Sequence, residues 1–141
     1  KDELLFQITM HLGGRAAELV KFGTATTGAA SDIERATDLA RKMVTQYGMS
    51  EHFGSMGLQS TQNQYLDSRN VATCTEQTGA EADEEIRRLL EQCQKEAIQI
   101  LGNHREALER IAAYLLERES ITGAEFMELL KKENPKAFEV E

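Results

Sequence analysis

Residues 78–101, TGAEADEEIRRLLEQCQKEAIQIL, contain the pattern that decides the fold of this chain. Their apolar side chains recur in alternating steps of three and four residues, which is typical of a helix that packs along a coiled-coil-like seam. The seam consists of Ala82, Ile86, Leu89, Leu90, Cys93, Ala97, Ile100 and Leu101. The 141 residues include a single proline, so little interrupts long helices. The sequence therefore predicts an all-α fold.

Helical spacing elsewhere predicts further helices, for about five in the whole chain. One runs from about residue 2 to about residue 20, one follows Ser31, one follows Asn103, and a short one ends before Pro135. The predicted inward residues are Leu5, Ile8, Leu12 and Leu19, then Ile33, Ala36, Ala40, Met43, Val44 and Tyr47, then Leu108, Ile111, Ala112 and Leu115, and finally Phe126, Leu129 and Leu130. The connection near Asn103 is short, so we expect the helices on either side of it to pack antiparallel as a long hairpin.

Capping residues indicate where these helices begin. A Ser, Thr or Asn with Glu three residues later can satisfy two backbone N–H groups at a helix N-terminus. This pairing occurs at Ser31/Glu34, Thr78/Glu81, Asn103/Glu106 and Thr122/Glu125. We therefore predict a helix start at each of these four positions.

Residues 48–77 show no helical periodicity. They contain Gly48, Gly54 and Gly57, followed by the polar run QSTQNQ at residues 59–64. A segment of this length without a regular pattern is usually functional or mobile. We expect one long loop, and a division into helices at 1–47, the loop at 48–77, a helical hairpin with a short helix at 78–132, and a tail at 133–141.

The charge distribution excludes several classes of protein. The net charge is −8, and residues 51–141 carry all of it, since residues 1–50 have six basic and six acidic side chains. An acidic half repels phosphates, which argues against a nucleic-acid or anionic-membrane surface.

No stretch approaches eighteen apolar residues, the length that a spanning helix needs. Cys74 and Cys93 form no C-x-x-C pair, which favours free thiols and a reducing compartment.

Few residues carry recognisable chemistry. His11, His52 and His104 are far apart, and none belongs to an H-E-x-x-H motif. The sequence also lacks a G-x-S-x-G elbow and a nucleotide-binding glycine motif. The remaining candidate is Asp32, where the run TTGAAS (26–31) leads into an amphipathic helix. A carboxylate there can stabilise the helix N-terminus or bind a metal, and the residues alone leave both readings open.

Several segments together resemble the FtsH family of membrane-anchored, ATP-dependent zinc metalloproteases. They are LGGRAAE (12–18), FG (22–23), TGA with Asp32 (27–32), AT (36–37), MVT (43–45) and GMSE (48–51). The resemblance covers essentially the whole chain and is weakest at residues 59–77. It implies a mostly helical peptidase domain in a six-fold ring, with zinc held by two histidines of an H-E-x-x-H helix and by an aspartate that matches Asp32.

The resemblance also implies hydrolysis of peptide bonds by a zinc-bound water, with the motif glutamate as general base. The chain opens on Lys1 without an initiator methionine, so we expect a piece of a longer protein whose H-E-x-x-H helix precedes it. By itself this piece should be soluble, bind zinc weakly and lack activity, since catalytic zinc needs three protein ligands. In the intact protein we expect an ATPase domain, a homo-hexamer and protein substrates from membrane and cytosol. The location implied is the cytoplasmic face of a bacterial inner membrane or an organellar membrane, with membrane contact only through segments absent here.

Two alternatives belong to other classes. The helices after Thr78 could form a non-enzymatic oligomerisation or assembly module, or part of a pseudoprotease with a degenerate metal motif. A free-standing signalling domain would require Lys1 to lie near a true N-terminus. The state of the motif upstream of Lys1 distinguishes the protease from the first alternative.

Overall fold

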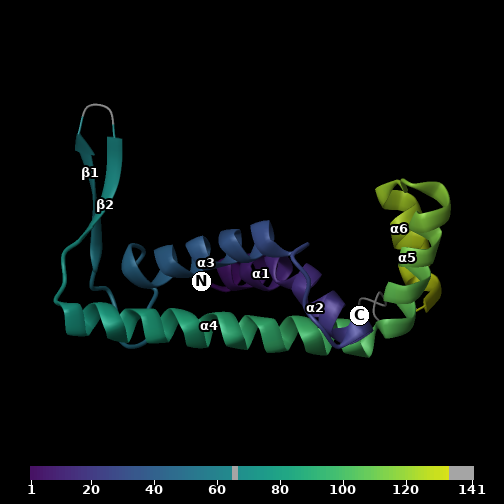
Figure 1. Cartoon of the computed structure of the whole chain (residues 1–141), viewed down its shortest axis with the longest axis horizontal. Helices are drawn as coiled ribbons and strands as arrows, with labels where there is room; N and C mark the ends of the chain where they lie inside the picture. Colours follow the sequence, from purple (N-terminus) through teal and green to yellow (C-terminus); the bar gives the residue numbers. More distant parts are fainter. Residues whose placement is uncertain (65–66, 134–141) are drawn as a thin grey trace, which may run out of the picture. The chain divides into compact units, whose positions relative to one another are not determined.

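The helices dominate the computed structural model, which describes residues 1–64 and 67–133. In chain order the elements are α1 (Asp2–His11), α2 (Gly13–Phe22), α3 (Ala30–Thr45), β1 (Gln59–Gln64), β2 (Asp67–Ala72), α4 (Glu76–Asn103), α5 (Arg105–Arg118) and α6 (Gly123–Glu133) (Figure 1). The all-α prediction is confirmed. The chain divides into two compact units, Lys1–Ile98 and Gln99–Glu141.

The core of the first unit lies where α1 and α3 pack against each other and against α4 (Figure 1). Its fully buried residues include Ile8 from α1, Met43 from α3 and Cys93 from α4. The seam predicted on α4 is confirmed in this unit, since Ala82, Ile86, Cys93 and Ala97 are buried and Leu89 and Leu90 are partly buried. The 28 residues of α4 thus provide the long surface on which the earlier helices pack.

The helix predicted for residues 2–20 is two helices, which corrects the first expectation. Leu12 lies between them with φ −77° and ψ −6°. Its N–H still donates to the Ile8 carbonyl at 3.0 Å, and its carbonyl accepts from Ala16 N–H at 3.0 Å. Two glycines follow at 13 and 14, where each weakens helix formation by about 1 kcal/mol relative to alanine. The helix therefore breaks at this point with little loss of backbone hydrogen bonding.

Tyr47 is half exposed, although the helical spacing of the segment predicted it to be buried. The cause lies in the last turn of the helix. Tyr47 N–H donates to the Lys42 carbonyl at 2.9 Å, five residues back, so the turn is wider than a regular α-helical turn. The side chain therefore leaves the buried face that Met43 and Val44 continue.

The predicted long loop is in part a β-hairpin. Strands β1 and β2 pair antiparallel, from Gln59 opposite Ala72 to Gln64 opposite Asp67. Leu58 fixes the base of this hairpin, because it is buried, donates to the Thr45 carbonyl at 2.8 Å and accepts from Thr73 N–H at 2.9 Å. The first part of the segment is also ordered by hydrogen bonds and stays close to α3 and α4.

That first part is held by Ser50. Its hydroxyl donates to Glu85 Oε2 on α4 at 2.7 Å, and accepts from the N–H groups of His52 and Phe53 at 3.0 and 2.8 Å. Glu51 N–H donates to the other oxygen of Glu85 at 3.1 Å. The turn between α3 and β1 is therefore fastened to α4.

Three of the four predicted helix starts are wrong. Ser31 lies inside α3, whose N-cap position is Ala29, with no side-chain cap hydrogen bond. The helix starts early because Ala30 N–H already bonds to the Thr27 carbonyl at 3.2 Å, so the preceding turn continues into the helix. Helix α4 likewise starts before Thr78, whose N–H donates to Thr75 Oγ1 at 3.3 Å.

The other two predicted starts have opposite outcomes. Asn103 ends α4, and His104 takes the N-cap position of α5 without a side-chain cap hydrogen bond. The capping box at Thr122 and Glu125 is confirmed: Thr122 N–H donates to Glu125 Oε2 at 2.8 Å, and Glu125 N–H donates to Thr122 Oγ1 at 3.3 Å. The hydrogen bond from the Thr122 backbone, with that from its hydroxyl, lowers the pKa of Glu125.

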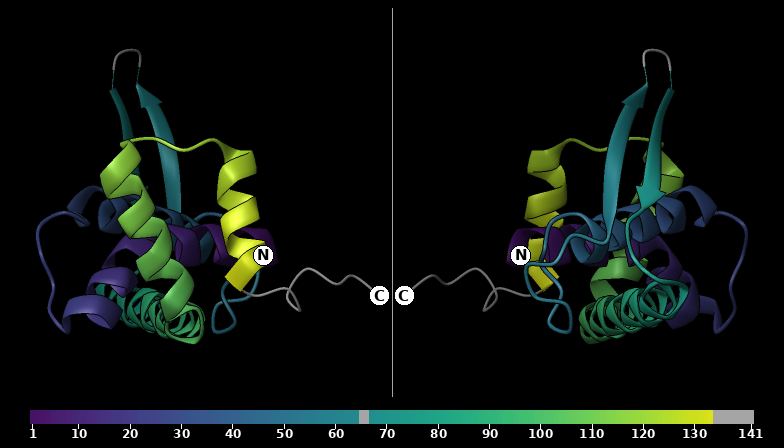
Figure 2. Two further views of the ribbon diagram at one scale, coloured as in Figure 1. Left: turned by 90° about the vertical axis from the view of Figure 1, so that its right-hand side faces the viewer. Right: turned by 90° about the vertical axis from the view of Figure 1, so that its left-hand side faces the viewer.

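Within the second unit, α5 and α6 pack on each other and run in opposite directions (Figure 2). Glu119 ends α5 in the left-handed region, with φ 62°. Ile111 is buried as predicted, and Ala107 is buried too. The inward positions predicted for Ile100, Leu115 and Phe126 are wrong, since these side chains are 48%, 38% and 39% exposed, and Leu116 is 86% exposed. The antiparallel pairing of α4 with α5 concerns both units and stays a prediction, and the end of regular structure at Pro135 lies outside the described residues.

An exposed ion-pair group covers the outer face of α4. Glu84 accepts two hydrogen bonds from Arg87, at 2.9 and 2.7 Å, and one from Arg88 at 3.1 Å. The Arg87 guanidinium lowers the pKa of Glu84 from 4.5 to about 2.

Over residues 1–64 and 67–133, no helix has the length and apolar character that crossing a membrane requires.

Candidate functional site

Asp32 lies in the first turn of α3, as the sequence predicted for a carboxylate after the TGA turn. Its side chain faces the junction between α1 and α2. The Oδ1 atom is 4.0 Å from Nδ1 of His11, the last residue of α1. The Asp32 side chain is 46% exposed and that of His11 is 25% exposed. The carboxylate is therefore supported on one side and open to solvent on another.

Gly14 forms the second neighbour of this carboxylate. A Cβ at position 14 would lie 3.9 Å from Asp32 Oδ2, in ordinary van der Waals contact, and the glycine leaves that space empty. Oδ1 of Asp32 thus lies toward the His11 imidazole, and Oδ2 lies toward the backbone of Gly14. The sequence indicated no relation between His11 and Asp32, because 21 positions separate the two residues.

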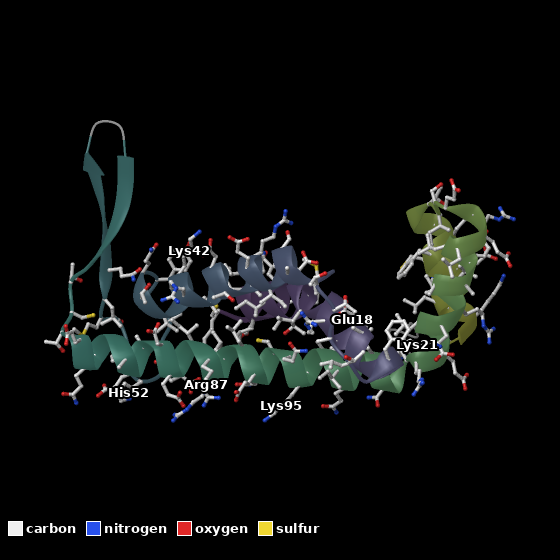
Figure 3. The ribbon with its side chains drawn as sticks, in the orientation of Figure 1. Glu18, Lys21, Lys42, His52, Arg87 and Lys95 are labelled. Atoms are coloured by element: carbon white, nitrogen blue, oxygen red, sulfur yellow. The ribbon has the colours of Figure 1, made fainter. Side chains whose placement is uncertain are left out.

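The loop that leads into α3 is fastened to α2 by Glu18, which is labelled in Figure 3. Glu18 Oε2 accepts from Thr26 N–H at 3.1 Å, and Oε1 accepts a short hydrogen bond from the Thr26 hydroxyl. The same hydroxyl accepts from Gly28 N–H at 3.1 Å. Arg15 donates to Glu18 Oε2 at 3.0 Å. These bonds fix residues 26–28 and hence the start of the helix that carries Asp32.

The charge of Glu18 is favoured by the same contacts. The pKa of Glu18 is lowered, first by the hydroxyl and then by the backbone N–H of Thr26. A Cβ at position 28 would lie 3.5 Å from Glu18 Oε1 and 3.4 Å from Thr26 Oγ1, which is ordinary van der Waals contact. The sequence placed Glu18 in the LGGRAAE segment but indicated no role for it. The sequence shows only that a carboxylate lies eight residues before a Thr-containing turn. No known sequence motif links two residues at that spacing.

Asp32 is an accessible carboxylate, a group that can supply one ligand to a metal ion. A structural or catalytic zinc ion needs at least three protein ligands. Among residues 1–64 and 67–133, no three His, Cys, Asp or Glu side chains converge in a way that could hold a metal ion. The described part of the chain therefore supplies an incomplete set of donors.

The other candidate residues lie apart from Asp32. His52 Nε2 is 3.3 Å from Glu81 Oε2, and its ring meets Phe53 edge-on at 4.7 Å. Cys93 is buried in the core, where burial raises the pKa of its thiol. His104 belongs to the second unit. Cys74 and Cys93 are both free, as predicted.

Hollows open on the surface of the first unit, and α4 lines at least two of them over the described residues. One, of about 450 Å³, has a mostly apolar lining between α2, α3 and α4, and its wall includes Leu19, Ile33 and Leu90. Gln94 also lines it, and its Nε2 atom is buried without a hydrogen-bond partner. Another, of about 350 Å³, has Lys1 and Glu85 in its wall. Asp32 lines neither of them.

Comparison with known proteins gives one consistent result. Residues 1–129 match the model of a family described as peptidase family M41. The chain is 48% identical over 141 residues, all of its length, to the ATP-dependent zinc metalloprotease FtsH of Clostridium perfringens. It is 48% identical over 134 residues, 95% of its length, to the protein of that name from Lancefieldella parvula. The ATP-dependent zinc metalloprotease FtsH 3 of Symbiobacterium thermophilum is 42% identical over 135 residues, 94% of this chain. The matched parts are 20%, 21% and 22% of these relatives, so the chain spans about a fifth of their length.

Proposed function

Because this chain belongs to peptidase family M41, we propose that it is part of an ATP-dependent zinc metalloendopeptidase. The proposal rests on the match over residues 1–129 and on the relatives' shared name. The substrates would be proteins, including membrane and cytosolic ones. Peptide hydrolysis would take place in the complete protein, which supplies what the described residues lack.

Asp32 is the residue that we assign to the metal. The carboxylate is about half exposed, lies in the first turn of α3, and has one oxygen beside the space that Gly14 leaves open. A carboxylate oxygen is an established zinc ligand. The bound metal would polarise the scissile carbonyl and activate water. The part that this chain plays is to hold one ligand in place, through α3 and the loop that Glu18 fixes.

The chain alone is expected to be inactive and to bind zinc weakly. Asp32 is the one residue assigned to the metal, and among the described residues no three His, Cys, Asp or Glu side chains converge to hold a metal ion. The other ligands, the general base and the ATPase domain would belong to the rest of the protein. We further propose a homo-hexamer at a membrane, on the cytoplasmic face in a bacterium or in an organelle, anchored by other segments.

The test compares the full-length protein with its Asp32→Asn variant. We expect the unaltered protein to contain about one zinc ion per subunit and to degrade casein with ATP. The variant should lose zinc and proteolysis, because the site needs each of its three protein ligands. Its ATPase activity should continue. Zinc content and casein cleavage that are unchanged in Asp32→Asn would refute the assignment. The isolated 141-residue chain should neither bind zinc stoichiometrically nor cleave casein.

A second candidate function is a non-enzymatic assembly module, favoured by the exposed apolar side chains of the second unit. Leu116 is 86% exposed, and Phe126 and Met127 are each 39% exposed. A contiguous patch of such side chains would mark an interaction surface. A full-length protein with a degenerate metal motif, no zinc and an intact ring would support this function instead of the protease.

A further inference from the structure

We propose that His11 is a positioning residue for Asp32: its Nδ1–H donates to Oδ1 of the carboxylate while the other oxygen binds the metal. The inference rests on the proposed function, since it assumes that Asp32 is a ligand. His11 would not touch the metal. Its effect would be to hold the carboxylate in a single orientation, with Oδ2 on the open side above Gly14.

The geometry of the pair supports this role. Nδ1 of His11 and Oδ1 of Asp32 are 4.0 Å apart, which is an ion-pair distance and about 1 Å longer than a hydrogen bond. Closing this gap requires a movement of about 1 Å, and catalytic hydrogen bonds are often long before the ligand binds. The His11 side chain is only 25% exposed, so packing restricts its ring. The less mobile partner is therefore the imidazole, and the carboxylate turns toward it.

The surroundings of Asp32 indicate that His11 is the residue that orients its carboxylate. Among the residues that the structure describes, His11 is the side chain that pairs with Asp32. The neighbour on the other side is a glycine, which has no side chain to offer. Carboxylates that bind metals are themselves hydrogen-bonded by outer residues, and these fix the orientation of the ligand. His11 and Gly14 thus give the two oxygens of one carboxylate different surroundings.

The experiment measures the Zn²⁺ affinity of the full-length protein by competition with a chelating dye. Four variants are compared with the unaltered protein: His11→Phe, His11→Leu, His11→Asn and Asp32→Asn. Removing the donor in His11→Phe should weaken Zn²⁺ binding by about 10–100-fold, the usual effect of losing an outer-shell partner. His11→Asn should restore most of the affinity, because the Asn Nδ2 atom lies close to the position of the His Nδ1 atom and also donates. His11→Leu repeats the test without a ring if the phenylalanine does not fold.

A second readout separates positioning from direct ligation. The visible spectrum of the Co²⁺-substituted protein reports the ligands themselves, and we expect the same band positions in the unaltered and His11→Phe proteins. A spectrum that shows one ligand fewer in His11→Phe would make His11 a ligand and overturn the positioning role. Zn²⁺ affinity that is unchanged in His11→Phe or His11→Leu, with Asp32→Asn weakened, would also overturn it. Unchanged affinity in Asp32→Asn would instead refute the proposed function.

Discussion

Gly48 and Gly54 provide a matched pair for testing the turn after α3. Both have left-handed backbones, with φ 61° and 57°. A Cβ at position 48 would lie 3.1 Å from Ser55 Cα and 3.4 Å from Ser55 C, whereas a Cβ at position 54 meets nothing within 4 Å. Alanine therefore encounters the same backbone penalty at both positions and a close contact at only one.

The expected magnitudes follow from these two terms. The left-handed conformation costs an L-residue about 1–2 kcal/mol, so Gly54→Ala should destabilise the chain by that amount. Gly48→Ala adds overpacking against backbone, which typically costs about 1–3 kcal/mol. Ser55 has little freedom to move away from residue 48, because the preceding residue, Gly54, is joined to Ser50 by a β-bridge. Gly48→Ala should therefore lower the free energy of unfolding by about 2–5 kcal/mol in total.

Urea denaturation of the 141-residue chain, followed by far-UV circular dichroism, measures both values. The dependence of the unfolding free energy on urea should be similar in the three proteins, since the surface exposed on unfolding is the same. The reasoning is refuted if Gly48→Ala is no more destabilising than Gly54→Ala. It is also refuted if neither variant loses stability, because the left-handed conformations would then be wrong.

Three other outcomes are expected. The chain should lose stability as the pH falls from about 4.5 toward 2, because the pKa values of Glu84 and Glu125 are lowered in the folded state and their contribution disappears when they are protonated. Urea titrations across this range should show a weaker pH dependence in Glu125→Gln, and an unchanged dependence would contradict the capping box. Ile8→Ala should cost about 2–5 kcal/mol, because Ile8 is fully buried, whereas Phe6→Ala at a 68% exposed site should stay within about 0.5 kcal/mol. Equal losses in a denaturation assay would contradict the assigned core. EDTA should leave the melting temperature of the chain unchanged, since its described residues form no three-donor metal cluster, and a fall in calorimetry would reveal a bound metal.

The sequence was most informative where burial decides the structure. The spacing of Ala82, Ile86 and Cys93 predicted the packed face of α4, because a helix exposes the same face at every third or fourth residue. Asp32 was placed correctly in a first helical turn for a related reason: the glycine-containing turn and the amphipathic segment meet there. Patterns of this kind depend on neighbours in the sequence.

The features that the sequence did not predict depend on contacts between distant residues. The polar run 59–64 has no alternation of apolar and polar residues, and its hairpin begins directly after Leu58, which tertiary packing buries. The break at Leu12 leaves its hydrogen bonds intact, and Gly13 and Gly14 weaken the helix there without forcing it to end. The approach of His11 to Asp32 requires α1 and α3 to be packed, and the pattern of either helix alone contains no sign of it.

The break at Leu12 has a mechanical consequence. His11 is the last residue of α1 and Gly14 belongs to α2, and both flank the same carboxylate of Asp32. The angle between α1 and α2 therefore sets the environment of the carboxylate, even when α3 does not move. A change in the angle at Leu12 would alter the distance from the imidazole to Oδ1 of Asp32.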